Sequence, residues 1–207
     1  CHLIFIFPRP DVSDIVYRYR EDRAAVPAEA LVQDETSKRL QARHTLCLIR
    51  RYRKNGSLLE IGAGAGYFLD EARKKGFDAV GIEVNRVHAA SIRDVLGIPC
   101  ETKPLHEGSF GLRRFDLIYH CNVLSHFHAP FEEFKKIRSK LSEGGILVFE
   151  TGNLGEVEQK YYKWFSAFEF PDHLFFFGKK SLGRLLALTG FTLIRFYEYD
   201  LSWQLIK

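Results

Sequence analysis

The chain has 207 residues, 46% of them apolar, and its 30 Lys and Arg against 26 Asp and Glu give a net charge of +4. This length supports one well-cored domain with an extension. The interspersed charges are too mild to argue for a nucleic-acid partner, and the one locally basic run, residues 50–54, is interpreted as a solvated helix end, so no nucleic-acid partner is predicted. No apolar run approaches the roughly 20 residues of a membrane span, so no membrane partner is predicted. The four cysteines are scattered without a CxxC pair, which predicts reduced thiols in a cytoplasmic protein.

Residues 1–28 form an N-terminal extension to the domain that we expect over residues 29–207. Cys1–Pro10 predicts a short strand followed by a proline turn. Residues 29–54 contain no proline or glycine and predict a long helix, which Asn55-Gly56 ends. The chain contains no methionine, so we expect it to be a piece of a longer protein.

Residues 57–83 hold the most informative pattern. An apolar strand over 57–61 leads into three glycines on alternate positions, and an amphipathic helix over 66–75 follows. Glycine permits positive φ and close approach of a ligand, and a helix N-terminus offers unpaired N–H groups. The next strand, 77–83, ends in Glu83, whose carboxylate can accept both hydroxyls of a ribose. The pattern predicts a nucleoside-containing cofactor at this turn.

Strands and helices continue to alternate beyond Glu83, which predicts a parallel sheet covered on both faces. The expected elements are helix 85–96, strand 98–101, strand 115–120, helix 130–141, strand 146–150, helix 180–189 and strand 191–200, with a further strand from residue 202. Residues 151–177 fit no regular element and are rich in aromatic side chains. A connection of this length in a compact domain is usually functional.

Two motifs resemble those of the class I S-adenosylmethionine (SAM) dependent methyltransferases. Glu-x-Gly-x-Gly-x-Gly, over 60–66, resembles their motif I, with Tyr67 where a dinucleotide site has a small residue. Residues 115–127 resemble the segment that follows their fourth strand, with Ser125 in place of the usual acid. The resemblance implies an α/β, Rossmann-like fold whose seven-stranded sheet is mostly parallel, with helices on both faces and an antiparallel last strand. It also implies that residues 151–177 form a lid over the SAM cleft.

This resemblance implies transfer of a methyl group from SAM to a small-molecule acceptor. Glu60 and the glycine-turn backbone would hold the methionine part, although Glu60 could instead be a strand-end acid tied to local N–H groups. Glu83 would bind the ribose hydroxyls. The family often has an acid where this chain has Lys103, so that adenine-edge contact departs from the pattern. The predicted cofactor-binding residues are Glu60, Gly62, Ala63, Gly64, Gly66, Tyr67, Phe68, Glu83, Val84, Thr102, Lys103, Pro104, His120, Cys121 and Asn122.

Histidines are the candidates for a general base, which methyl transfer needs only if the acceptor is protonated. His126 and His173 are the predicted catalytic residues, with His128 a further candidate, because a pKa near 6.5 suits proton removal at neutral pH. His173 falls in a segment that resembles a Pro-x-His-Leu motif of the family lid, and we expect it to point into an acceptor pocket formed by 161–177. The alternative for each is a histidine bonded to a backbone carbonyl.

Three other interpretations stay open. Cys1–Pro10 resembles the segment after a small zinc ribbon, with Cys1 as its last ligand, but an ordinary edge strand fits equally well. These residues alone hold no metal, because structural zinc takes four ligands. The chain could also be a nucleotide-dependent oxidoreductase or epimerase, which would need a small residue at Tyr67, or a non-catalytic SAM-fold binding protein.

Overall fold

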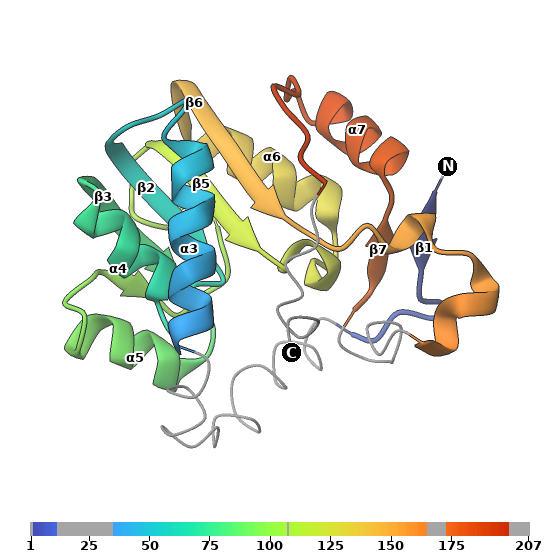
Figure 1. Ribbon diagram of the computed structural model, residues 1–207, viewed down its shortest axis with the longest axis horizontal. Helices are drawn as coiled ribbons and strands as arrows, with labels where there is room; N and C mark the ends of the chain where they lie inside the picture. The colour runs from blue at the N-terminus through green and yellow to red at the C-terminus, as the bar shows by residue number, and fades with distance from the viewer. Residues whose placement is uncertain (1, 12–34, 107, 165–172, 199–207) are drawn as a thin grey trace.

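A parallel sheet forms the centre of the molecule in the computed structural model, which describes residues 2–11, 35–106, 108–164 and 173–198. Its strand order is β4-β3-β2-β5-β6, and all four neighbouring pairs are parallel (Figure 1). The strands are β2 (Gly56–Ile61), β3 (Phe77–Ile82), β4 (Cys100–Glu101), β5 (Phe115–Cys121) and β6 (Leu141–Glu150). Because the strands run in one direction, their carboxyl ends share one edge of the sheet.

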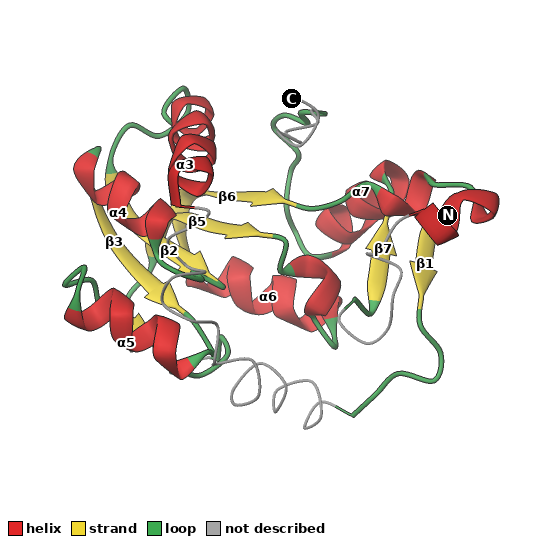
Figure 2. Cartoon of the chain, turned by 60° about the horizontal axis from the view of Figure 1, so that its bottom comes forward, coloured by secondary structure: helices red, strands yellow, loops and turns green. Residues whose placement is uncertain are grey.

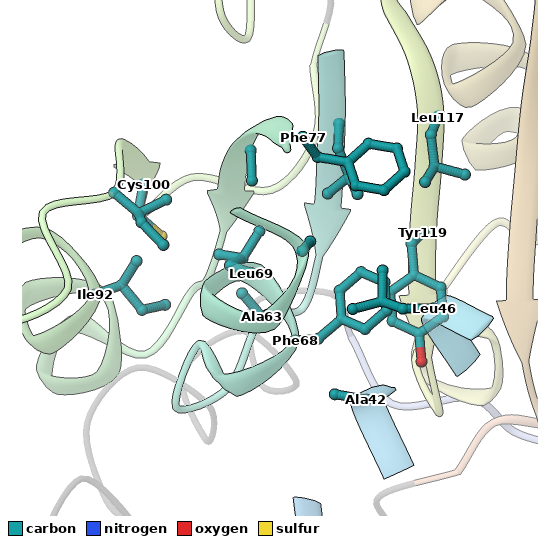
Figure 3. Close-up of a cluster of buried hydrophobic side chains, with 14 of the residues drawn as sticks. Ala42, Leu46, Ala63, Phe68, Leu69, Phe77, Ile92, Cys100, Leu117 and Tyr119 are labelled. Atoms are coloured by element: carbon teal, nitrogen blue, oxygen red, sulfur yellow. The ribbon is translucent and has the colours of Figure 1, made fainter. Parts of the chain in front are cut away.

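Helices cover both faces of this sheet because the strand side chains alternate between two apolar clusters. The first face packs against α3 (Glu35–Ile49), α4 (Tyr67–Lys74) and α5 (Arg86–Asp94). Figure 3 shows this cluster, in which Leu117 and Tyr119 of β5 meet Leu46 of α3 and Phe68 of α4. The second face packs against α6 (Pro130–Lys140) and α7 (Lys179–Leu188).

A second, two-stranded sheet lies beside the main one, next to α7 (Figures 1 and 2). It pairs β1 (Leu3–Phe5) with β7 (Phe175–Phe177) in antiparallel register. The predicted short strand near the N-terminus therefore exists, and its partner comes from the end of the predicted lid. Cys1, residues 12–28 of the N-terminal extension and residues 29–34 of the predicted long helix lie outside the described residues.

The fold class is the predicted one, but the predicted strand count is wrong: the main sheet has five strands within the described residues, not seven. Residues 191–198, expected to be a strand, have no strand pairing, and Leu193 and Ile194 are exposed. Alternation of apolar and polar residues predicts only that one side of a segment is buried. A strand also needs a neighbouring strand to pair with its backbone N–H and C=O groups. The other strand expected in this region, from residue 202, lies outside the described residues.

Two more segments differ in detail from the predicted elements. Residues 142–145, expected to connect helix 130–141 to strand 146–150, lie inside β6. There the pairing jumps from Phe115↔Leu141 to Leu117↔Ile146, so the extra residues form a bulge in the ladder. The segment 151–177 contains the 3-10 turns η3 (Leu154–Glu156) and η4 (Gln159–Trp164) before β7, and 165–172 lies outside the described residues. In the described part of the chain, no helix is long and apolar enough to cross a membrane.

Candidate active site

The glycine turn, residues 62–66, connects β2 to α4 at the carboxyl edge of the sheet. Gly62, Gly64 and Gly66 have φ values of 73, 54 and 80°, in the left-handed region that side chains disfavour. A Cβ added to Gly62 would lie 2.5 Å from Val123, whereas one added to Gly64 would have no heavy atom within 4 Å. Gly62 is therefore required for packing, whereas Gly64 faces open space.

Glu83, directly after β3, is aimed at this turn. Its Oε2 accepts from the backbone N–H of Gly64 at 2.7 Å, and its Oε1 accepts from that of Asn85 at 2.8 Å. Burial raises the pKa of Glu83, and these two backbone bonds oppose the rise. A carboxylate has about four lone-pair sites, so the fixed group retains acceptor capacity for hydroxyl donors.

Glu60, at the carboxyl end of β2, is only 4% exposed, and its Oε2 is buried with no hydrogen-bond partner in the described part of the chain. Its pKa is raised well above the ordinary value, first by burial and then by the carboxylates of Glu83 and Glu150. A backbone bond from Leu69 opposes the rise. The bond from Leu69 agrees with the interpretation of Glu60 as a strand-end acid tied to a local N–H group. The buried Oε2, which has no hydrogen-bond partner within the described residues, agrees with the interpretation of Glu60 as a ligand-binding acid. Such an oxygen fits a ligand that carries positive charge or N–H donors.

Glu150, at the end of β6, was missed by the sequence analysis. Its Oε1 accepts from the Tyr119 hydroxyl at 2.5 Å and from Thr45 Oγ1 at 2.8 Å. The Tyr119 ring stacks on Phe68, with centroids 3.9 Å apart (Figure 3). This network joins α3 to the sheet and to the first turn of α4. A signal was present in the sequence, because this acid ends an apolar strand as the two predicted acids do.

Arg39, on α3, was also missed. Its guanidinium lies 4.9 Å from the centroid of the Tyr67 ring. Its Nη1 donates to Asp70 at 2.6 Å and to Glu71 at 2.9 Å, so α3 is fixed beside the glycine turn. The sequence carried no signal for this arginine, because charged residues on a helix are usually solvated.

The other predicted cofactor residues follow the neighbouring strands at the same edge. The backbone N–H of Glu83 donates to the Glu101 carbonyl at 2.9 Å, which places the loop after β4 next to Glu83. Asn122, with φ of 55°, donates its N–H to the Glu150 carbonyl at 2.9 Å. The predicted cofactor residues in these loops are Val84, Thr102, Lys103, Pro104, Cys121 and Asn122. Their roles in binding the cofactor stay predictions.

His120 differs from the others because its side chain lies on the opposite face of the sheet. The ring is completely buried, stacks on Phe149 at 5.1 Å, and has edge contacts with Phe127 and Phe134. Burial lowers its pKa to about 3. Neither ring nitrogen has a hydrogen-bond partner within the described residues. The ring is thus part of the apolar core, while its backbone pairs with Ile61 at the carboxyl end of β2. The predicted cofactor role of His120 stays a prediction that its backbone alone would have to fill.

The two predicted catalytic histidines lie together although they are distant in sequence. The rings of His126 and His173 stack with centroids 4.7 Å apart and an interplanar angle of 29°. The N–H of Leu174 donates to the Ser125 carbonyl at 2.8 Å, which holds the two segments in contact. His128 lines a surface groove, where its carbonyl accepts from Arg9 Nη1 at 2.7 Å. Their chemical roles stay predictions.

A parallel sheet with a glycine turn and strand-end acids at its carboxyl edge defines the Rossmann-like class of α/β proteins that bind a nucleoside cofactor there. Within that class, a family model described as a methyltransferase domain matches residues 32–195. The chain therefore belongs to this family of class I methyltransferases, which use SAM as methyl donor. The glycine-turn and Glu83 geometry fits that cofactor.

Relatives with known names match about half of the chain. A tRNA U34 carboxymethyltransferase of Shewanella woodyi is 27% identical over 104 residues, and one of Tolumonas auensis is 30% identical over 105. Each match covers 47% of this chain and 32% of the relative, so the chain spans about a third of their length.

Solved structures share the fold at lower identity. A SAM-dependent methyltransferase of Leishmania major has a TM-score of 0.62 at 15% identity, covering 88% of this chain and 74% of that one. A ribosomal protein L11 methylase of Lactobacillus delbrueckii has a TM-score of 0.55 at 15% identity, covering 77% and 74%. At such identities these likenesses concern the fold alone.

Proposed function

We propose that the chain transfers a methyl group from SAM to a small-molecule acceptor. The observation that carries this proposal is the open glycine turn at Gly64, whose N–H is bonded to Glu83 at 2.7 Å. A ligand that combines a ribose with an amino-acid part would meet the acceptor oxygens of Glu83 and Glu60 and the open space beside Gly64 at that edge. SAM, when bound, supplies a methyl group already attached to a good leaving group.

The chain's own residues would mainly bind and orient the two reactants. Glu83 is fixed by two backbone bonds and would accept the ribose hydroxyls with its remaining lone pairs. Glu60 would offer its orphan oxygen to the charged methionine end, and a nearby cation would favour the ionised carboxylate over the protonated one. Orientation of this kind contributes on the order of 7–11 kcal/mol in well-aligned systems.

The histidine pair would assist an acceptor that must lose a proton. His126 belongs to the turn η2 (Leu124–His126) after β5, on the loop that starts at the cofactor edge, and His173 packs on it. Imidazole can exchange a proton near neutral pH. We keep His173 and His126 as the proposed catalytic residues on this basis.

A tRNA acceptor is the second candidate, because it is what the named relatives act on. The exposed cations that favour it, Arg50, Arg51 and Lys54, directly precede β2. The glycine turn directly follows β2, so the basic cluster lies at the opposite end of this strand. RNA held there would not reach the turn directly, and we therefore favour a small acceptor.

The function is tested by calorimetric titration with SAM and NAD, followed by release of S-adenosylhomocysteine in the presence of small-molecule and tRNA panels. The proposal expects binding of SAM, not NAD, and turnover with a small molecule. Turnover with tRNA alone would reverse the choice of acceptor. SAM binding without turnover on any panel would favour a non-catalytic binding protein.

A further inference from the structure

A groove of about 520 Å³ lies against the β1–β7 sheet, outside the predicted cofactor residues. The groove is open to solvent rather than enclosed, so a bound ligand would lie along its wall with one side exposed. Figure 2 shows this small sheet at the end of the molecule away from α5. His128, on the loop that follows β5, forms part of its wall. The groove and the cofactor edge therefore share one loop.

Aromatic side chains give the groove its apolar surface. Phe5 and Phe175 are cross-strand partners, and Phe7 follows on the same segment. Phe5 is 57% exposed and Phe7 is 86% exposed. Aromatic side chains of this size gain much from burial, so exposed phenylalanines around a hollow favour a planar apolar ligand.

Arg9 gives the groove a directed positive charge. Its Nη1 donates to the His128 carbonyl at 2.7 Å, and its guanidinium lies 5.6 Å from the centroid of the Phe175 ring. These contacts orient the guanidinium, which has five N–H donors. Within the described residues Arg9 forms no salt bridge, although the carboxylate of Asp11 also lines the groove. An oriented guanidinium with spare donors suits a carboxylate or phosphate group.

We propose that this groove binds the methyl acceptor and that the acceptor combines a planar apolar body with an anionic group. This inference rests on the proposed function, whose acceptor class it names. The aromatic side chains would pack on the body of the ligand, and Arg9 would bind its anionic group. His128 and Phe175, which line the groove, lie two residues after His126 and His173, so the bound acceptor would share these two segments with the proposed catalytic pair.

The test uses 1-naphthoate and its neutral analogue 1-naphthamide as probes, titrated by fluorescence into the full chain. The proposal expects naphthoate to bind about tenfold more tightly than naphthamide, since bonds to a charged acceptor are the stronger ones. Arg9→Gln removes this preference, and Asp11→Asn keeps or increases it. Phe7→Ala weakens both probes alike. The control Leu112→Ala, at a fully exposed residue outside the groove, leaves both unchanged.

Equal affinities of the two probes, no binding of either, or a preference that survives Arg9→Gln would overturn the proposal. So would a concentration-dependent dimer in sedimentation experiments that excludes naphthoate, because a second copy would then be the occupant. SAM binding is measured separately by calorimetry on the same variants. Absence of the probe preference in the wild type, with normal SAM binding, defeats this inference alone, whereas absence of SAM binding by the wild type defeats the proposed function.

Discussion

His120 should make folding stability depend on pH in a way that one substitution removes. Burial lowers its pKa to about 3, whereas an unfolded histidine has a pKa near 6.5. Between these two pKa values the imidazole is protonated in the unfolded chain but neutral in the folded chain. The free energy of unfolding therefore decreases as pH falls from about 6.5 toward about 3. At pH 5, one and a half units below the unfolded pKa and at 1.36 kcal/mol per unit, the loss is about 2 kcal/mol.

His120→Phe should abolish this loss. Phenylalanine keeps the stacking on Phe149, at 5.1 Å in the wild type, and removes two buried nitrogens that have no partner in the described part of the chain. Removing unsatisfied polar atoms should also stabilise the protein at pH 8, by about 1–3 kcal/mol.

The measurement is urea denaturation of the wild type and of His120→Phe at pH 8 and pH 5, with the exposed histidine variant His44→Gln as control. The difference in unfolding free energy between the two pH values should shrink by about 2 kcal/mol in His120→Phe only. An unchanged difference in that variant would show that the imidazole is protonated or solvated in the native state, and the reasoning would fail.

Three further substitutions test the site. Glu83→Gln should weaken SAM binding about tenfold by calorimetry, because bonds to a charged acceptor are the stronger ones; unchanged affinity would refute the ribose assignment. Glu60→Gln should stabilise the ligand-free protein at pH 8, because the raised pKa of Glu60 means that stability is lost as pH rises through it; a less stable variant in urea denaturation would contradict this. Arg39→Met should cost about 1–3 kcal/mol of stability by leaving Asp70 and Glu71 less well paired; a stability equal to that of the wild type would show that the ion pairs are not what docks α3.

The cofactor half of the fold was predictable because its chemistry is local. Three glycines on alternate positions, each with positive φ in the structure, fixed the turn between β2 and α4. The acid after β3 was predicted to bind a ribose at this edge; the structure shows Glu83 hydrogen-bonded to the Gly64 N–H of the turn, and its ribose role stays a prediction. Where strands pair in parallel, the carboxyl ends meet at one edge, so the position of the site followed from the order of elements.

Features that depend on distant pairing were not predictable. The small sheet joins β1 to β7 from opposite ends of the chain, and no local pattern specifies that partnership. His120 was assigned to the cofactor edge by its place at the strand end, yet the alternation along β5 turns its ring to the other face. Arg39 became visible only once α3 was placed beside Tyr67.

The central claim, that the glycine turn binds SAM, is tested most directly by calorimetric titration of Gly64→Ala against Gly97→Ala. Both glycines have positive φ, 54 and 61°, and an added Cβ at either meets no heavy atom within 4 Å. Each variant therefore carries the same backbone strain, about 1–2 kcal/mol, but only Gly64 faces the proposed ligand. The account predicts wild-type SAM affinity for Gly97→Ala and at least a tenfold loss for Gly64→Ala, about 1.4 kcal/mol or more. Equal affinities in the two variants, or no SAM binding by the wild type, would contradict it.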